Sequence, residues 1–394
     1  MNVRHIIQES MLAATAALTL VSCGLMTEDQ SDCPTGLYVN FVYDYNIQRA
    51  DMFKEHVGGL TLYVYDESDR LVAQRTVSGS ELKEYGYFIH FSEDELAPDH
   101  QYRISAVALQ KNWDDALQTS GAKYRKTDLK TGDDKRQALT VKLDHSQGKP
   151  YGEVSAEAPL DTLWHTFGTL ITDSPTRPAA TNYNQNRDGA KPQNNVETVS
   201  VIKGIPTYAT VSLIRDTNHL NLSLFEITQN IETGIYEEIG GAIAEDYQVF
   251  IIDDNTDVDY ENNVIAPADS VIYRPYAQWT TTIDEDIAVQ LNQQPSSAHY
   301  DLMFNRLRYN SEGKNARLVV LKKETGENVA TFNLPRTLSM VSTSYEYRYK
   351  PQEYLDREFD FRLELFLQNG KWVYANLYIA TLPYVIRPQD VILD

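Results

Sequence analysis

The sequence lacks the residues on which several protein classes depend. Cysteine occurs only at Cys23 and Cys33 in 394 residues, so a disulfide framework is excluded. Basic residues are also scarce, because 35 Lys and Arg stand against 56 Asp and Glu and give a formal net charge of −21. A surface this acidic repels phosphate backbones, and we expect no nucleic-acid partner.

Recognisable catalytic motifs are missing as well. The eight His residues show no metal-ligand spacing, and the chain contains no phosphate-binding loop, G-x-S-x-G elbow or dinucleotide fingerprint. The acidic residues could supply the paired carboxylates of a glycosidase, but no pair stands out. We therefore expect neither enzymatic activity nor a cofactor.

Long apolar runs are absent except at the N-terminus. Residues 11–21 are apolar or small and follow Arg4 and His5, which is the pattern of a signal peptide and too short to span a bilayer as a helix. The run ends in Leu20-Val21-Ser22-Cys23, which resembles the bacterial lipobox. The resemblance implies a signal peptide over residues 1–22 and acyl chains such as palmitate on Cys23, which would anchor the protein in the outer membrane.

Residues 23–35 are predicted to form a flexible tether behind the acylated cysteine. Its acidic residues resemble the surface-export signal of Bacteroidota lipoproteins, so exposure at the cell surface is expected. Cys33 has no cysteine or nearby histidine beside it, which favours a packed or idle thiol.

Beyond the tether, the sequence predicts an all-β fold. Apolar residues alternate with polar ones in short runs separated by polar turns, and helical periodicity is scarce. We predict two β-sandwich domains, over residues 36–153 and 154–394, the second with long loops. Local signals predict a turn from Asp216 to His219, a short helix at 354–358 and a type I′ hairpin at Asn369-Gly370.

One acidic loop resembles the beginning of a calcium site. Asp253, Asn255, Asp257 and Asp259 alternate, as in an EF-hand loop, but Val258 and Val264 occupy the positions that require Gly and Glu. We therefore predict no EF-hand. The residues remain a weak calcium candidate, and a solvated turn is the favoured interpretation.

The whole chain resembles the fimbrillin-A-associated anchor proteins of Bacteroidota. The resemblance rests on the lipobox followed by a series of segments in the same order. These segments are residues 33–43, 59–66, 213–222, 354–358, 370–372 and 386–390. Tyr384 stands where the family usually has Trp. The resemblance implies two transthyretin-like sandwiches and a non-enzymatic lipoprotein at the base of a fimbrium, or pilus, acting in cell adhesion.

The resemblance also implies fimbrillin subunits as partners, with the anchor fixing the polymer and limiting its length. An unpaired sheet edge can accept a strand from another subunit. The C-terminal residues Val385, Ile386, Val391, Ile392 and Leu393 are candidates for an exchanged strand, and an ordinary final strand is the equal alternative. A different function is a surface lipoprotein that binds glycans or host proteins, because Tyr and Trp could stack on sugars.

Overall fold

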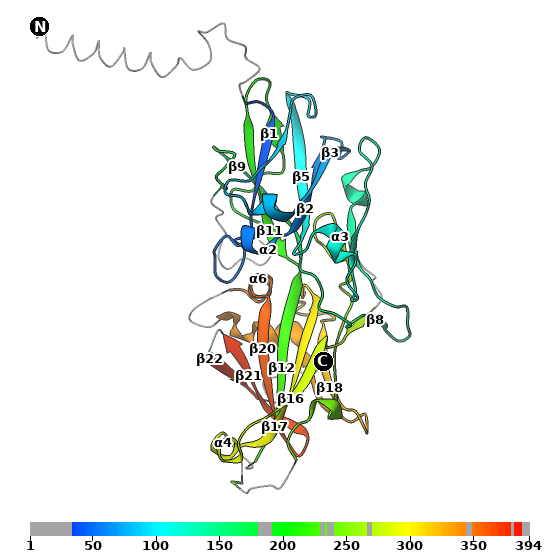
Figure 1. The fold of residues 1–394 in the computed structure, drawn as a ribbon, viewed down its shortest axis with the longest axis vertical. Helices are drawn as coiled ribbons and strands as arrows, with labels where there is room; N and C mark the ends of the chain where they lie inside the picture. Colours follow the sequence, from blue (N-terminus) through cyan, green and yellow to red (C-terminus); the bar gives the residue numbers. More distant parts are fainter. Residues whose placement is uncertain are drawn as a thin grey trace, which may run out of the picture.

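The structure, a computed structural model, describes residues 34–179, 191–228, 233–234, 240–265, 270–343, 349–379 and 382–387. Two β-rich bodies lie end to end along the long axis of the molecule (Figure 1). Strands dominate both bodies, so the prediction of an all-β fold is confirmed. The transthyretin-like subclass stays a prediction.

The upper body is built on an eight-stranded sheet with the order β3-β2-β5-β9-β11-β1-β4, and β10 pairs with β5. One half of the sheet consists of β3, β2 and β5, and the other half of β9, β11, β1 and β4. The two halves meet where β5 and β9 share three residue pairs, from Val107↔His165 to Leu109↔Leu163. The strands are Leu37–Val42 (β1), Gly59–Tyr65 (β2), Leu71–Ser78 (β3), Ile89–Phe91 (β4), His100–Leu109 (β5), Leu163–Thr172 (β9), Val199–Val201 (β10) and Thr207–Arg215 (β11).

The core of the upper body lies between these two halves. Leu60 and Leu62 of β2 are buried in one apolar cluster with Val39 of β1 and Val211 of β11. These positions alternate along each strand, as expected when one face of a strand faces the core. The predicted alternation in the N-terminal segments therefore identifies this core.

A third layer covers the other face of β2. It is a three-stranded sheet of β6 (Tyr124–Lys126), β7 (Thr140–Leu143) and β14 (Asp257–Asp259). Tyr63 and Tyr65 are buried with this layer in a second apolar cluster. Because β14 comes from the later part of the chain, it ties the C-terminal half to the upper body.

The lower body is a sandwich of two sheets. A six-stranded sheet has the order β16-β17-β12-β20-β21-β22, and a five-stranded sheet has the order β19-β18-β13-β15-β8. Leu222, Tyr300 and Leu363 from the first sheet share one core with Ile251 and Leu318 from the second. The strands are Gly152–Val154 (β8), Thr217–Ile227 (β12), Tyr247–Asp253 (β13), Val271–Tyr273 (β15), Ala277–Thr282 (β16), Gln293–Asn305 (β17), Arg317–Lys322 (β18), Asn328–Asn333 (β19), Asp360–Gln368 (β20), Lys371–Ile379 (β21) and Leu382–Ile386 (β22).

Helices are short and lie at the ends of strands. The prediction of a helix near residues 354–358 is confirmed by α6, which begins with Pro351, a residue favoured in the first helical turn. The helices are Phe53–His56 (α2), Trp113–Ala116 (α3), Glu285–Gln290 (α4), Leu334–Ser339 (α5) and Pro351–Arg357 (α6), with 3₁₀ turns at Gly79–Lys83 (η2), Arg136–Ala138 (η3), Ala244–Asp246 (η4) and Met340–Thr343 (η5).

The predicted turn from Asp216 to His219 is wrong. Strand β11 ends at Arg215 and β12 begins at Thr217, so the chain passes from the upper sheet to the lower one through Asp216. The backbone N–H of Asp216 donates to the carbonyl of Leu163, and its carbonyl accepts from Arg306 N–H. A polar sequence is tolerated here because its groups find partners between the two bodies.

The sheets also divide the chain differently from the predicted domains 36–153 and 154–394. Strands β9, β10 and β11, which follow residue 154, belong to the upper sheet with β1 to β5. Strand β8 lies before them in the sequence, yet it pairs with β15 of the lower sandwich. The change of body lies at Asp216, because long-range strand pairing rather than local composition assigns each strand to its sheet.

Candidate functional site: the junction between the two bodies

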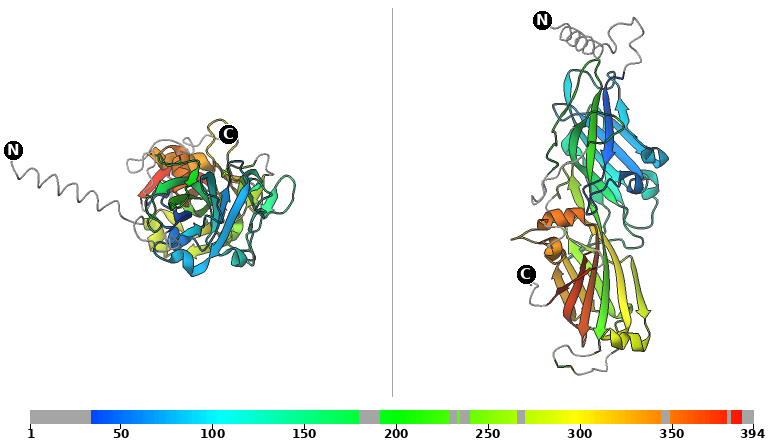
Figure 2. Two further views of the ribbon diagram at one scale, coloured as in Figure 1. Left: turned by 90° about the horizontal axis from the view of Figure 1, so that it is seen from above. Right: turned by 90° about the vertical axis from the view of Figure 1, so that its left-hand side faces the viewer.

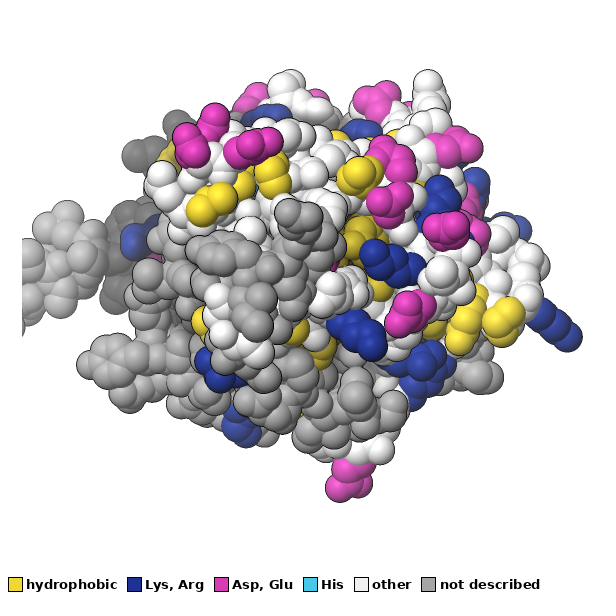
Figure 3. Space-filling model, turned by 90° about the horizontal axis from the view of Figure 1, so that it is seen from below, with side chains coloured by type: hydrophobic (Ala, Val, Ile, Leu, Met, Phe, Trp, Pro, Cys, Tyr) yellow, Lys and Arg dark blue, Asp and Glu magenta, His cyan; other side chains and the backbone are white. Residues whose placement is uncertain are grey.

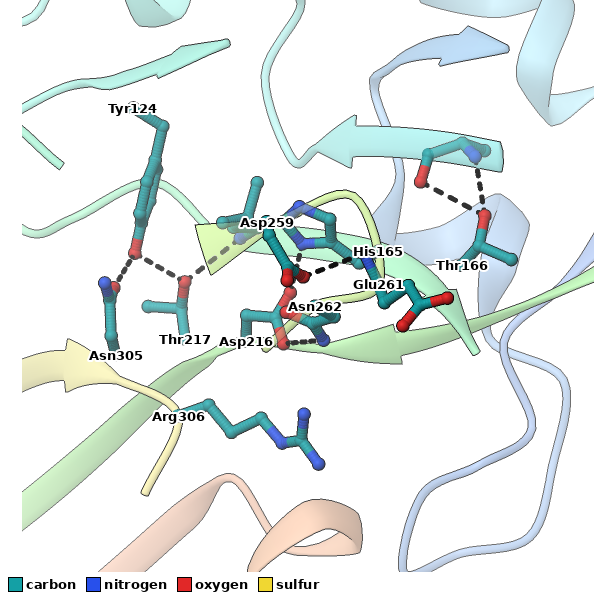
Figure 4. Close-up of polar contacts among 12 residues, drawn as sticks. Tyr124, His165, Thr166, Asp216, Thr217, Asp259, Glu261, Asn262, Asn305 and Arg306 are labelled. Carbon is teal, nitrogen blue, oxygen red and sulfur yellow. Dashed lines mark hydrogen bonds and ion pairs between the residues drawn. The ribbon is translucent and has the colours of Figure 1, made fainter. Parts of the chain in front are cut away.

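A buried polar cluster lies where the two bodies meet (Figure 4). Asp216, between β11 and β12, has its Oδ2 atom 2.5 Å from Nδ1 of His165 on β9. Its Oδ1 atom accepts a hydrogen bond of 2.6 Å from Nδ2 of Asn262. The side chains of His165 and Asp216 are each 3% exposed, so solvent screens this contact little.

A second set of hydrogen bonds continues from Thr217. Its hydroxyl lies 2.9 Å from the hydroxyl of Tyr124 on β6, which donates to Oδ1 of Asn305 at 2.6 Å. Asn305, at the end of β17, donates from Nδ2 to the carbonyl of Asn255, and Asn255 Nδ2 donates back to the carbonyl of Asn305. Tyr273 of β15 donates to Oδ1 of Asn255 at 2.6 Å. This network joins strands from both bodies.

An ion pair closes the lower side of the junction. Arg306 donates from Nε and Nη2 to the two carboxylate oxygens of Asp356 in α6, at 2.7 and 2.9 Å. Burial alone would lower the pKa of Arg306, but the Asp356 carboxylate outweighs burial and holds that pKa above its ordinary value. Gln352 donates to the same carboxylate, so α6 is fixed against the end of β17.

The junction arrangement is suited to holding two bodies together rather than to catalysis. A His–Asp pair activates a nucleophile only if the second ring nitrogen faces one. Within the described ranges, Nε2 of His165 is buried and has no hydrogen-bond partner. A cavity of about 260 Å³ lies beside the cluster and is lined by Asp216, Asn262, Arg306 and Gln352 among others.

The four residues of the weak calcium candidate do not converge on one point. Asn255 belongs to the junction network, and Asp257 pairs with Lys142 at 3.0 Å. Asp259 accepts from the backbone N–H groups of Glu261 and Asn263, which closes the turn after β14. Among the residues that the structure describes, no group of three His, Cys, Asp or Glu side chains is placed to hold a metal ion.

Asp253, the remaining member, is buried at the end of β13. Its Oδ1 accepts a hydrogen bond from the backbone N–H of Asp254. Burial raises the pKa of Asp253 to about 7, and the neighbouring carboxylate of Asp254 adds to the rise, while Arg308 and Lys314 oppose it. This carboxyl therefore holds its proton more tightly than an exposed aspartate does.

The other predicted functional residues lie apart from the junction. Cys23, Val391, Ile392 and Leu393 lie outside the described residues, as does Cys33. Val385 and Ile386 belong to β22, which pairs antiparallel with β21 of its own sheet. Ile386 is buried and Val385 is 51% exposed, so the two residues face opposite sides of that edge strand.

Sequence reasoning missed the junction residues His165, Asp216 and Asn262. A weak signal exists at His165, which interrupts the otherwise apolar start of β9. The local sequence predicts a turn at Asp216, and Asn262 follows an acidic stretch that resembles solvent-exposed sequence. Their function as partners depends on contacts between segments 46 and 51 residues apart, which local patterns do not encode.

Comparison with known proteins identifies the family. The model of the fimbrillin-A associated anchor proteins Mfa1 and Mfa2 matches residues 30–390, and the chain belongs to this family. The resemblance stated from the sequence is thereby confirmed. No curated protein sequence matches the chain.

Solved structures share the fold across nearly the full chain. A putative polysaccharide-binding protein from Bacteroides thetaiotaomicron is 23% identical, with a TM-score of 0.63, and the match covers 91% of this chain and 100% of the other. A putative adhesin from Bacteroides ovatus is 20% identical, with a TM-score of 0.58, and the match covers 90% and 96%. The fimbrial anchor protein Mfa2 from Porphyromonas gingivalis is 17% identical, with a TM-score of 0.54, and the match covers 90% and 99%.

Membership in this family associates the chain with fimbriae and with the cell surface that carries them. In the part of the chain that the structure describes, no helix is both long and apolar enough to cross a membrane.

Proposed function

We propose that this protein is a surface lipoprotein that fixes a fimbrium to the outer membrane and limits the length of the polymer. It acts as the anchor, or as a minor accessory subunit, and contacts fimbrillin subunits by strand addition. Its contribution is structural and not catalytic. Acyl chains on Cys23 hold the membrane end, while sheet edges of the lower body bind the polymer.

The observation that carries this proposal is the position of the two ends of the molecule. Strand β1 runs parallel to β11, which ends at the junction, so Leu37 lies at the far end of the upper body (Figure 1). The tether from Cys23 therefore reaches the end opposite the lower sandwich. Outer strands of the lower body are then held away from the membrane, where a partner strand can reach them.

The junction supports the same role, because an anchor must transmit force between its ends. Buried hydrogen bonds and the Arg306–Asp356 pair connect the two bodies. Strand β14 adds a backbone pairing with β7 across them, from Asp257↔Lys142 to Asp259↔Thr140. Pulling on the lower body must break these contacts together, which resists separation.

The test uses the native bacterium, with Cys23→Ala and a matched Cys33→Ala control. We expect a clickable palmitate analogue to label the wild type and Cys33→Ala but not Cys23→Ala. We also expect the wild-type protein to sediment with purified filaments. Labelling of Cys23→Ala would contradict the lipid anchor, and absence of the protein from filaments would contradict the fimbrial function.

A further inference from the structure

Five rings form a row across the outer face of the six-stranded sheet. In order they are Trp279 on β16, His299 on β17, Phe225 on β12, Phe366 on β20 and Tyr374 on β21. Successive ring centroids are 5.3, 6.2, 5.2 and 4.3 Å apart. Three of the four contacts are stacked, with interplanar angles of 18, 21 and 7°. The rings of these three contacts turn their faces towards one another, whereas Phe225 and His299 meet edge to face at 83°.

The row ends at the edge of the sheet. Trp279 stacks on His299 with one face, and β16 is the outermost strand on that side. Trp279 is 38% exposed, and among the described residues no ring stacks on its other face. At the opposite end, β21 is followed by β22, so the row does not end at an outermost strand there.

The edge of β16 lacks the usual protection against pairing. Natural edge strands carry charges, prolines or bulges that prevent added strands. Ala277–Thr282 contains no charged residue and no proline. By contrast, the outer strands β3, β8 and β22 contain Arg75, Glu153 and Pro383 respectively. The outer strand β19 also lacks charge and proline, but its one ring, Phe332, is buried, whereas Trp279 of β16 is exposed.

Apolar and acidic side chains surround the end of β16. Ile287, Val289 and Leu291, on α4 and just after it, are 51, 56 and 59% exposed. Residues 277–291 include three acidic residues, Asp284, Glu285 and Asp286, and no Lys, Arg or His. Seen from below, this end of the molecule shows apolar side chains next to acidic ones at one side, and Lys and Arg side chains at its centre and other side (Figure 3). A complementary partner is therefore apolar in its centre and basic at its ends.

We infer that the free edge of β16 accepts a strand from a separate fimbrial subunit. The added strand is uncharged, is flanked by Lys or Arg, and places a planar side chain on the open face of Trp279. This inference rests on the proposed anchor function and names the site where it operates. Backbone hydrogen bonds supply the affinity, and the Trp279 contact sets the register.

The ends of this chain are poorly placed to cover the same edge. The first strand, β1, begins at Leu37 and lies in the upper body, at the far end of the molecule from β16 (Figure 2). The C-terminal residues 388–394 follow β22, which lies at the opposite edge of the same sheet. Five strand spacings, about 24 Å, separate the two edges.

The test places p-benzoylphenylalanine at three positions of the full-length protein in the native bacterium. Position 279 reports on the β16 edge, and positions 331 and 385 report on the outer strands β19 and β22. We expect illumination to join position 279 to a subunit that is also present in purified filaments, with at least tenfold less product at the other two positions. Product mainly at position 331 or 385 would overturn this inference while leaving the anchor function in place.

Other products at position 279 would also overturn the inference. A second copy of this chain would indicate self-association, and a carbohydrate adduct would indicate glycan binding. Absence of the protein from the filament fraction would contradict the proposed function itself, so the two failures are distinguishable.

A charge on the edge gives an independent test with a matched control. Gln278 is exposed on β16, and Gln278→Lys places a positive charge there. Thr331→Lys introduces the same charge on the uncharged outer strand β19. We expect Gln278→Lys to reduce co-sedimentation with filaments by at least fivefold and Thr331→Lys to leave it unchanged. Equal behaviour of both variants, at unchanged thermal stability, would contradict a site on β16.

Discussion

The two ends of the six-stranded sheet carry different side chains although the same strands form both ends. At the junction, β12 and β17 contribute Thr217 and Asn305, which are buried and both hydrogen-bond to the hydroxyl of Tyr124. Further along, the same strands contribute Phe225 and His299, which are half-buried members of the ring row. At the junction end, the polar groups are already hydrogen-bonded within the protein. At the other end, an aromatic face stays exposed beside the unpaired edge of β16.

This difference has an energetic consequence. Removing a group from a buried hydrogen-bonded network leaves its partners unpaired and costs several times more than removing a half-exposed contact. Mutations at the junction should therefore act on folding, whereas mutations at the β16 edge should act on binding with little effect on folding. The following predictions test this separation.

The largest effect is expected for Asp216→Ala. The substitution leaves both His165 and Asn262 buried without their carboxylate partner, and we expect a loss of about 3–5 kcal/mol in the free energy of unfolding. Urea titration followed by tryptophan fluorescence measures this loss. Asp360→Ala, at a side chain that is 66% exposed, is the control and should cost less than about 1 kcal/mol. Equal losses would contradict the buried junction.

The next effect depends on pH and concerns Asp253. Because burial raises its pKa from 3.8 to about 7 in the folded state, the folded protein binds a proton more tightly than the unfolded chain. Its contribution to stability is therefore present below about pH 4 and is lost as pH rises through 7. Asp253→Asn keeps the oxygen that accepts from Asp254 but cannot ionise.

We expect Asp253→Asn to become more stable relative to wild type as pH rises from 4 to 8, by about 4 kcal/mol. Thermal unfolding at both pH values measures the difference. A stability difference that is constant between these pH values would show that Asp253 ionises normally in the folded protein.

A smaller effect is expected inside the ring row. Phe366 stacks on Phe225 and on Tyr374, so Phe366→Ala removes two ring contacts from a half-buried position. We expect a loss of about 1–2 kcal/mol in unfolding free energy, measured by urea titration. A loss as large as that of Asp216→Ala would contradict the comparison, because the outer face would then be as critical as the junction.

The smallest effect is expected for Lys142→Ala. Lys142 pairs with Asp257 across the β7–β14 contact, but its side chain is 59% exposed. Solvent screens such a pair, so we expect a change below about 1 kcal/mol in the same titration. A larger loss would mean that this ion pair, rather than the backbone pairing of β14, holds the third layer.

Local features of the fold were predictable from the sequence. Asn369-Gly370 was predicted as a type I′ hairpin, and both residues adopt the positive φ values that this turn requires, 54 and 70°. The short helix α6 and the alternating strands were found for the same reason. In each case the signal lies within a few neighbouring residues.

Non-local features were not predictable in this way. The assignment of β8 to the lower sandwich and of β9 to the upper sheet depends on pairing with strands far along the chain. The acidic loop at residues 253–259 looked like a cation site or a solvated turn. Its residues instead end β13, join the junction and form β14, which pairs with β7. The chain changes sheets within residues 213–222, one of the segments on which the family resemblance rests.

The central claim is that the lipid on Cys23 and the polymer are held at opposite ends of one molecule. The direct measurement compares filaments on cells with filaments in the medium for wild type, Cys23→Ala and Cys33→Ala. The account predicts that filaments of Cys23→Ala are shed into the medium, while those of Cys33→Ala stay attached. Filaments that remain attached in Cys23→Ala cells, at normal number and length, would contradict it.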